Sequence, residues 1–358
     1  MLHDLFGTKP SILLSLFAMA ALVQAPSAPK APPQAPAAAP TSTKGSGLKP
    51  PTELFEIVKV VDGDTIHIKR AGKVEKLRLL SVDTEEKFSS GTAPGGTKPP
   101  TVFGEECALW AQKFFADLGK DGAAPRIGIS FPGGHENYDF YGRLLCHVIL
   151  PDGTDYNLML VKLGKSPYFS KYGFSESEHA AFVAAQKEAQ TKQLGIWNPK
   201  TNVPATDGAP AAKRPYDKLV PWWDARGEAV QAWRAAFAKD AAAVCDANES
   251  AQLERAARGE KEVEVFGEID RMRDEPDGSI TVHFRASMKD KALVVTIPKE
   301  QREAHAALAL ATLGEEFHQN YVWFRGLVRT GPKGFLADSD SATRWRRAGP
   351  EPKLPKEG

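Results

Sequence analysis

The sequence predicts an α+β protein in which two small β-barrels are joined by a helical linker. Two observations lead to this fold class. Short runs rich in β-branched and aromatic residues recur in residues 51–200 and again in 261–347. Between them, residues 201–260 begin with a Pro/Ala/Gly-rich stretch and continue with apolar residues at helical spacing. The length of 358 residues also agrees with roughly two domains.

Composition and charge narrow the class of protein. Lys and Arg number 46 and Asp and Glu 45, which excludes a strongly basic surface that coats nucleic acid without specificity. The apolar content of 42% excludes a wholly disordered chain. The three cysteines include no C-x-x-C pair, which argues against a cysteine-rich zinc site.

The first residues are typical of an export signal. The apolar run 12–23 is followed by the small residues Ala25 and Ala28, so a signal peptide is predicted over 1–28 and the protein is expected to be secreted or periplasmic. The alternative is a buried helix of the mature protein. A membrane span is not expected, because the run is shorter than the roughly 20 residues that a bilayer requires. Residues 29–50 are rich in Pro and Ala and are predicted to be a disordered linker.

Five strands and three helices are predicted for the first domain in the order β-β-β-α-β-β-α-α. An Asp-Gly turn between two apolar runs in 55–70 predicts a hairpin. The remaining strands are expected over 76–82, 126–131 and 142–150, and the helices over 104–120, 155–164 and 176–191. Five short strands with a helix after the third predict a closed barrel of the oligonucleotide-binding (OB) type.

Three local clusters of this domain carry candidate chemistry, namely 62–65, 78–86 and 141–143. The first two contain carboxylates, which are ligands that a hard cation such as Ca²⁺ prefers. The last two contain arginines, whose planar guanidinium groups hold phosphate oxygens in pairs. A cation and two arginines would neutralise the charge that builds on a phosphoryl group under attack. Taken singly, each cluster also fits a structural role as a turn, a strand with a solvent-facing arginine, or a solvated acidic face.

The clusters and their neighbours occur in a known order. Residues 55–197 resemble the staphylococcal nuclease (thermonuclease) family through the stretches VVDGDTI, LRLLSVDTEE, FGEECALWAQKF, YDFYGR, LGKSPYFSKY and QLGIW. The resemblance implies a five-stranded barrel with three helices. It also implies Ca²⁺-dependent hydrolysis of DNA or RNA that leaves 3′-phosphate ends.

Metal and catalytic roles follow from the resemblance by matched position. Asp64 and Asp83 match the family's Ca²⁺ carboxylates, and the Thr84 carbonyl matches a third ligand. Glu86 falls where the family has a glutamate that orients water or acts as the general base.

Substrate contacts follow in the same way. Arg78 and Arg143 match the two arginines that contact phosphate and belong to the catalytic set. Tyr141, Tyr172 and, less closely, Tyr168 match nucleotide-pocket tyrosines that stack on a base or contact a phosphate. For Tyr168 and Tyr172 the alternative is packing in the fold.

This chain departs from the family pattern at several points. The usual Asp-Thr-Pro-Glu is here Asp83-Thr84-Glu85-Glu86, so a carboxylate replaces a proline beside the metal ligands and is expected to loosen the loop. The loop 87–102 is longer than usual, and Phe140 stands where a basic residue is frequent. These departures bear on affinity and substrate preference.

The remaining predictions concern packing. Cys107 and Cys146 are expected either to form a disulfide or to be small core residues. The helical segment 216–257 is expected to pack between the domains, with a helix that binds a partner as the alternative.

The last domain, 261–347, is predicted to be a second, OB-like barrel, followed by a disordered tail over 348–358. Its strand-like runs are expected over 262–272, 279–286, 292–298, 320–330 and 333–339, with a helix over 299–313. It would either bind single strands through Phe284, Trp323 or Arg325, or only support the fold.

The leading functional hypothesis is an exported Ca²⁺-dependent nuclease acting as a monomer on single-stranded DNA or RNA. The alternative is a non-catalytic module on the same barrel that binds nucleic acid or protein. A third hypothesis, an interaction protein of the cell envelope, rests only on the linker and the Trp-rich helical segment.

Overall fold

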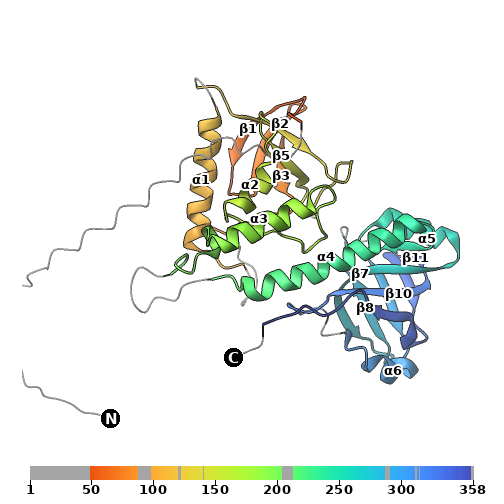
Figure 1. Cartoon of the computed structure of the whole chain (residues 1–358). Coiled ribbons are helices and arrows are strands. Elements are labelled where there is room, and N and C mark those ends of the chain that lie inside the picture. Colours follow the sequence, from red (N-terminus) through yellow and green to blue (C-terminus); the bar gives the residue numbers. More distant parts are fainter. Residues whose placement is uncertain are drawn as a thin grey trace, which may run out of the picture. The chain divides into compact units, whose positions relative to one another are not determined.

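The computed structural model describes residues 49–87, 98–119, 122–139, 141–203, 213–286, 291–310, 313 and 315–355 (Figure 1). The predicted signal peptide over 1–28 and nearly all of the predicted linker over 29–50 lie outside the described residues. In the described part of the chain, no helix has both the length and the apolar character that crossing a bilayer requires.

The first domain is a closed five-stranded barrel. Its strands pair in the order β1-β2-β3-β5-β4, in which only β3 and β5 are parallel. The strands are β1 (Phe55–Val60), β2 (Thr65–Arg70), β3 (Lys73–Leu79), β4 (Arg126–Ser130) and β5 (Leu144–Ile149). Alternate side chains such as Ile66, Ile68 and Leu77 fill the core because successive residues of a strand point to opposite faces. The predicted OB-type barrel is confirmed.

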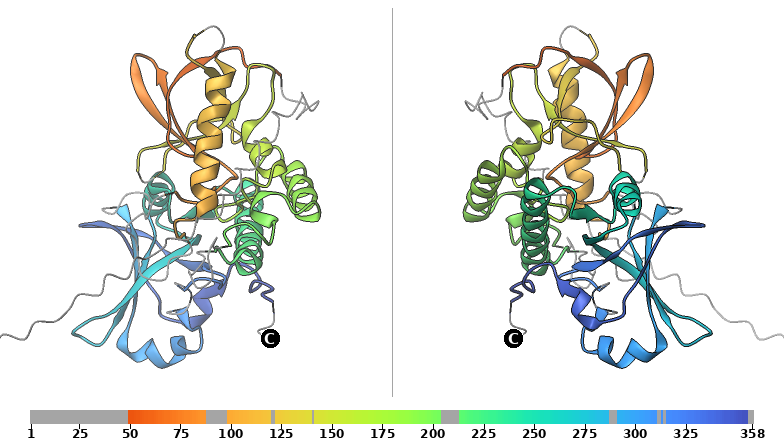
Figure 2. Two further views of the ribbon diagram at one scale, coloured as in Figure 1. Left: turned by 90° about the vertical axis from the view of Figure 1, so that its left-hand side faces the viewer. Right: turned by 90° about the vertical axis from the view of Figure 1, so that its right-hand side faces the viewer.

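Three α-helices belong to this domain, namely α1 (Val102–Leu118), α2 (Tyr156–Lys162) and α3 (His179–Thr191), followed by the 3₁₀ turn η1 (Gly195–Trp197). The side chain of Thr101 caps α1 by accepting from Gly104 N–H, and Asp155 caps α2 by accepting from Leu158 N–H. The ring of Phe115 of α1 lies 4.7 Å from that of Tyr156 of α2 at an angle of 51°, and both are buried against the barrel. Figure 2 shows α1 running alongside the strands.

The linker forms the long helix α4 (Tyr216–Lys239), the short strand β6 (Val244–Asp246) and helix α5 (Ser250–Gly259). The first half of α4 packs Trp222 and Trp223 near Phe169 of the first domain. Its second half packs Ala229 and Val230 on aromatic side chains of the last domain, namely Phe266, Tyr321 and Trp323. Packing between the domains was the predicted role of this segment, but β6 was not predicted.

The last domain contains seven strands: β7 (Glu262–Asp274), β8 (Ile280–Phe284), β9 (Leu293–Ile297), β10 (Tyr321–Leu327), β11 (Arg329–Gly331), β12 (Gly334–Asp338) and β13 (Trp345–Arg347). Strands β7, β8 and β9 form an antiparallel meander, and β9 pairs with β12 in parallel. Only Val328 separates β10, which pairs with β7, from β11, which pairs with β12. Residues 321–331 therefore pair with β7 through β10 and with β12 through β11. This gives the same order of strand pairing as in the first barrel, as predicted.

Smaller elements of the last domain differ from the prediction. In the described part of the helix expected over 299–313, the structure has a 3₁₀ turn, η3 (Lys299–Gln301), followed by a short helix, α6 (Arg302–Ala306). A further 3₁₀ turn, η5 (Ala342–Arg344), precedes β13. Ala348 and Glu351, placed in the tail by the sequence, both contact the domain: Ala348 N–H donates to Tyr321 O, and Glu351 accepts from Gln319 N–H.

Two expectations about single side chains are corrected. Phe284 is 1% exposed and Trp323 is 4% exposed, so neither ring is available to stack on a base. Arg325 remains exposed and pairs with Glu262 at 3.1 Å. Cys107 and Cys146 are both buried and carry free thiols, which agrees with the alternative of two core residues.

Candidate active site

The first two acidic clusters meet at one end of the first barrel. Asp64 directly precedes β2, and Asp83 lies in the loop that follows β3. Leu79 N–H donates to the Asp64 carbonyl at 3.0 Å, so the hairpin register brings the two segments together. Gly63 permits this close approach, because a Cβ atom there would lie 2.6 Å from Thr84 Cγ2 and 2.9 Å from Cys107 Sγ.

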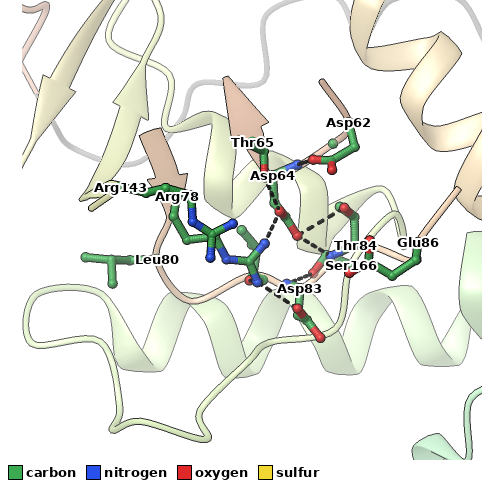
Figure 3. A network of polar contacts seen from close by, with 12 residues as sticks. Asp62, Asp64, Thr65, Arg78, Leu80, Asp83, Thr84, Glu86, Arg143 and Ser166 are labelled. Atoms are coloured by element: carbon green, nitrogen blue, oxygen red, sulfur yellow. Dashed lines mark hydrogen bonds and ion pairs between the residues drawn. The ribbon is translucent and has the colours of Figure 1, made fainter. Parts of the chain in front are cut away.

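Arg78 lies between the two carboxylates (Figure 3). Its Nη1 donates to Asp64 Oδ1, and its Nη2 donates to Asp83 Oδ1 at 2.7 Å. The side chain leaves β3 where Arg78 pairs with Thr65 of β2 and Leu145 of β5. One arginine therefore ties together the two predicted metal-binding aspartates.

The loop after β3 is held by further hydrogen bonds. Thr84 donates to Asp64 Oδ2 twice, through its N–H at 2.7 Å and its hydroxyl at 3.1 Å. Asp83 N–H donates to Ser166 Oγ at 2.8 Å. Asp62 accepts from Asp64 N–H at 3.1 Å, which keeps the turn before β2 tight. The main-chain groups around the two aspartates are thus bound in place.

Asp83 is fully buried and faces three cationic side chains. Besides Arg78, Lys98 Nζ lies 2.6 Å from its Oδ1, and Arg214 Nη2 lies 2.7 Å from its Oδ2. Burial alone would raise the pKa of Asp83, but Lys98, Arg214 and Arg78 together hold that pKa well below its usual range. Asp83 is therefore ionised at any physiological pH.

Glu86 is the carboxylate of the site that remains accessible. Its side chain is 30% exposed, and Lys98 Nζ lies 3.9 Å from its Oε1. Burial raises the pKa of Glu86 above its ordinary value, and the neighbouring charges of Asp83 and Asp62 add to this effect. A carboxylate of raised pKa, free of any tight ion pair, is suited to accept a proton from water.

Arg143 lies on the same flank as Arg78 (Figure 3). It precedes β5, in which Leu145 is paired with Arg78, and residues two apart on a strand share a face. Asp139 orients the guanidinium, because its Oδ2 accepts from Arg143 Nε at 2.7 Å. The ring of Tyr141 lies 5.4 Å from the guanidinium carbon and is 76% exposed.

The two other predicted tyrosines lie in different environments. Tyr172 is 60% exposed, and its ring lies near Lys171 and Phe169. Tyr168 is 2% exposed; its hydroxyl accepts from Ser175 N–H and lies 3.0 Å from His179 Nδ1. Tyr168 therefore has the packing role that was the alternative, since a ring enclosed in the core cannot stack on a nucleotide.

Lys98 and Arg214 were not assigned a role from the sequence, and Glu85 has a different role from the expected one. Lys98 lies 15 positions after Asp83, the carboxylate that it contacts, and Arg214 lies 131 positions after the same carboxylate. Glu85 was expected to loosen the loop, but it is 2% exposed and accepts hydrogen bonds from Asn202 at 2.7 Å and from Tyr216 at 3.1 Å. No local pattern signals such distant partners, so only the fold reveals them.

A second polar cluster lies within the same domain. One ligand atom each of His147, Asp155 and Glu178 falls within 4.8 Å of the others, and His147 Nδ1 lies 2.6 Å from Asp155 Oδ2. Burial and a hydrogen bond to Asp155 raise the pKa of Glu178 to about 7. This cluster was not predicted from the sequence.

The three carboxylates at the barrel end fit a hard divalent cation. Asp64, Asp83 and Glu86 supply carboxylate oxygens, which are the ligands that Ca²⁺ and Mg²⁺ bind in proteins. These three carboxylates are more widely spaced than the ligand atoms of the cluster of His147, Asp155 and Glu178. The reason is that Arg78 and Lys98 lie among them. The ammonium of Lys98 lies 2.6 Å from the carboxylate of Asp83 and 3.9 Å from that of Glu86. Positive charge is therefore stabilised at this point of the site.

Comparison with known proteins assigns the first domain. A family model described as "Staphylococcal nuclease homologue" matches residues 76–199. The thermonuclease of Staphylococcus intermedius is 32% identical over 145 residues, which are 40% of this chain and 76% of that protein. The endonuclease YhcR of Bacillus subtilis is 37% identical over 142 residues, but this chain spans only 11% of its length. With its closed barrel and this similarity, the chain belongs to the staphylococcal nuclease family.

Proposed function

We propose that this protein is an exported, Ca²⁺-dependent nuclease that hydrolyses phosphodiester bonds of single-stranded DNA or RNA. One observation carries the proposal: Asp64, Asp83 and Glu86 meet at the barrel end with Arg78 between them and Arg143 beside them. Family membership and the nuclease names of the relatives support the same reaction class. Export is proposed from the character of residues 1–28.

The proposed reaction is attack of water on phosphorus. The water oxygen forms a bond to phosphorus and gives its proton to Glu86, while the bond from phosphorus to the 5′-oxygen breaks. The 5′-oxygen keeps the electron pair and takes up a proton, so the products are a 3′-phosphate and a 5′-hydroxyl. Glu86 suits this role, since its pKa is raised and its side chain reaches solvent.

The cation and the arginines share the task of stabilising charge. Asp64, Asp83 and the Thr84 carbonyl would hold Ca²⁺, which would draw charge from the phosphate oxygens. Arg143 is oriented by Asp139 yet part-exposed, so its free N–H groups can bind a phosphate oxygen. Tyr141 and Tyr172 present exposed rings on which the bases of a single strand can stack.

The testing experiment is cleavage of end-labelled single-stranded DNA and RNA by the purified protein, with Ca²⁺ or with a chelator. Glu86→Gln and Arg143→Ala are compared with Arg325→Ala, which removes an exposed arginine of the second barrel. We expect Ca²⁺-dependent cutting, loss of about 100-fold or more in both site variants, and no change in Arg325→Ala. Mapping of the product ends should find 3′-phosphate.

Two results would change the proposal. A folded protein that cuts neither polymer under any condition, yet binds single strands, would be a non-catalytic binding module. Secreted protein that retains Met1 would contradict the export signal, and N-terminal sequencing decides this point.

A further inference from the structure

A segment outside the region that the family model matches contacts the candidate metal ligands directly. The match ends at residue 199, and Arg214 lies beyond it, just before α4. Arg214 Nη2 donates to Asp83 Oδ2 at 2.7 Å, and Nη1 donates to the Asp83 carbonyl at 3.3 Å. Side chain and main chain of one candidate ligand are therefore held by the same guanidinium.

Arg214 is itself fixed by the start of α4. Its guanidinium carbon lies 5.4 Å from the ring centre of Tyr216 and 5.6 Å from that of Trp223. The side chain is 1% exposed. Because Arg214 is enclosed, it cannot reach a bound nucleic acid, so it would act on the reaction through the groups that it contacts, among them Asp83.

Glu85 makes a second connection to the same segment. Its Oε1 accepts from the Tyr216 hydroxyl at 3.1 Å, and its Oε2 accepts from Asn202 Nδ2 at 2.7 Å and from the hydroxyl of Thr101. Proline, the residue usual in the family, could make none of these bonds. Glu85 therefore does not loosen the loop but ties it to α1 and α4.

The geometry points to Arg214 and Tyr216 as positioning residues of the active site, an inference that rests on the proposed nuclease function. Arg214 holds Asp83 Oδ2, which turns Oδ1 toward Arg78 and Lys98. Tyr216 holds Glu85, one residue before Glu86. The nuclease domain of this chain is thus completed by residues of the following segment.

Loss of Arg214 has a definite physical consequence for Asp83. The buried carboxylate would keep Arg78 and Lys98 on Oδ1, while Oδ2 would lose its partner and the side chain would be free to turn. Metal affinity should fall, because the ligand would no longer be held in its binding orientation. Lysine at the same position would restore the charge on Oδ2 but not the second bond to the Asp83 carbonyl.

The test uses the full chain with Arg214→Ala, Arg214→Lys and Tyr216→Phe. Arg234→Ala is the matched control, because Arg234 also ties α4 to the nuclease domain, through Phe174 O at 2.8 Å and Glu176 at 3.2 Å, away from the site. Tb³⁺ luminescence measures metal binding without turnover, and cleavage kinetics at saturating metal give kcat and KM. Circular dichroism confirms that each variant is folded.

We expect Arg214→Ala to weaken Tb³⁺ binding at least fivefold and to lower kcat at least tenfold at similar KM. Arg214→Lys should recover part of both losses, as should millimolar guanidinium added to Arg214→Ala, and Tyr216→Phe should lower kcat about threefold. Folded Arg214→Ala that binds Tb³⁺ as tightly as the parent would overturn the proposal, as would equal losses in Arg234→Ala. If the parent cuts no nucleic acid, only the proposed function fails, because the Tb³⁺ titration still tests the positioning.

Discussion

The two barrels of this chain have the same order of strand pairing but differ in the charged residues that their strands and strand ends carry. In the first, β3 carries Arg78, and the residues that flank β2 and β3 are Asp64 and Asp83. In the second, the corresponding strand β9 reads LVVTI and carries no charge. The fold therefore determines which positions meet at the end of a barrel. Whether that end carries a polar site depends on a few charged residues at the strand ends.

The aromatic surfaces of the two barrels differ as well. Tyr141 and Tyr172 of the first are exposed by more than half. Tyr321 and Trp323 of the second are less than a tenth exposed, because α4 covers that side of β10. The second barrel therefore uses its aromatic residues to hold a helix.

The sharpest test of this contrast exchanges arginine for alanine on each barrel. Arg78→Ala removes the group between the two aspartates, so we expect kcat to fall about 100- to 1000-fold. Arg329→Ala on the second barrel breaks only an exposed pair with Asp338 and should leave kcat unchanged. Steady-state cleavage of a labelled single strand measures both, and a comparable loss in Arg329→Ala would mean that the second barrel also acts on the substrate.

The next largest effect concerns the covered face of the second barrel. Trp323→Ala should lower the free energy of unfolding by about 3–5 kcal/mol, because it empties a packed site under α4. Affinity for a single strand should stay the same. Urea denaturation and fluorescence anisotropy check the two parts, and lost affinity with unchanged stability would assign Trp323 to nucleic-acid binding.

A smaller effect is expected from the ammonium of Lys98 beside the candidate metal ligands. Lys98→Met removes a positive charge next to Asp83 and Glu86, so Ca²⁺ should bind about fivefold more tightly. Lys113→Met, which removes an exposed lysine of α1 paired with Asp117, is the control. Calorimetric titration gives both affinities, and weaker binding in Lys98→Met would show that Lys98 helps to order the ligands.

The smallest effect is a change in how stability depends on pH. The pKa of Glu178 is about 7 in the folded protein, against an ordinary value of 4.5. Between these values the folded state holds a proton that the unfolded chain has released, so the free energy of unfolding falls as the pH rises through this window. Asp155 titrates below the window, because hydrogen bonds to its carboxylate overcome burial and lower its pKa.

Glu178→Gln keeps a hydrogen-bond donor but cannot ionise. From pH 5 to pH 8 the Tm of the parent should fall by about 2–4 °C more than that of the variant. Thermal melts at both pH values measure the difference. Parallel curves for the two proteins would mean that Glu178 is ionised throughout.

The sequence was informative wherever the signal was local. Apolar alternation and turn residues predicted both barrels, and the order of the acidic and basic motifs brought Asp64, Arg78 and Asp83 together correctly. Trp323 was misjudged, although Tyr321, Val322, Trp323 and Phe324 form an unbroken apolar run, which indicates a strand covered on both faces.

Contacts distant in sequence could not be predicted. Glu85 looked like an added charge near a metal, because its partners Asn202 and Tyr216 lie more than 100 residues away. Tyr168 matched a family position, but its burial depends on packing against Phe182 of α3. In both cases the deciding quantity is tertiary packing, which a motif does not encode.

The long separation between Asp83 and Arg214 has a consequence for synthesis on the ribosome. The two residues are 131 positions apart, so the loop is made well before its partner. At roughly 5–20 residues per second, the delay is on the order of 10 seconds. During that interval Asp83 can have Arg78 and Lys98 as partners but not yet Arg214. The bonds from Arg214 to Asp83 therefore form only after the segment that follows the first domain has been made.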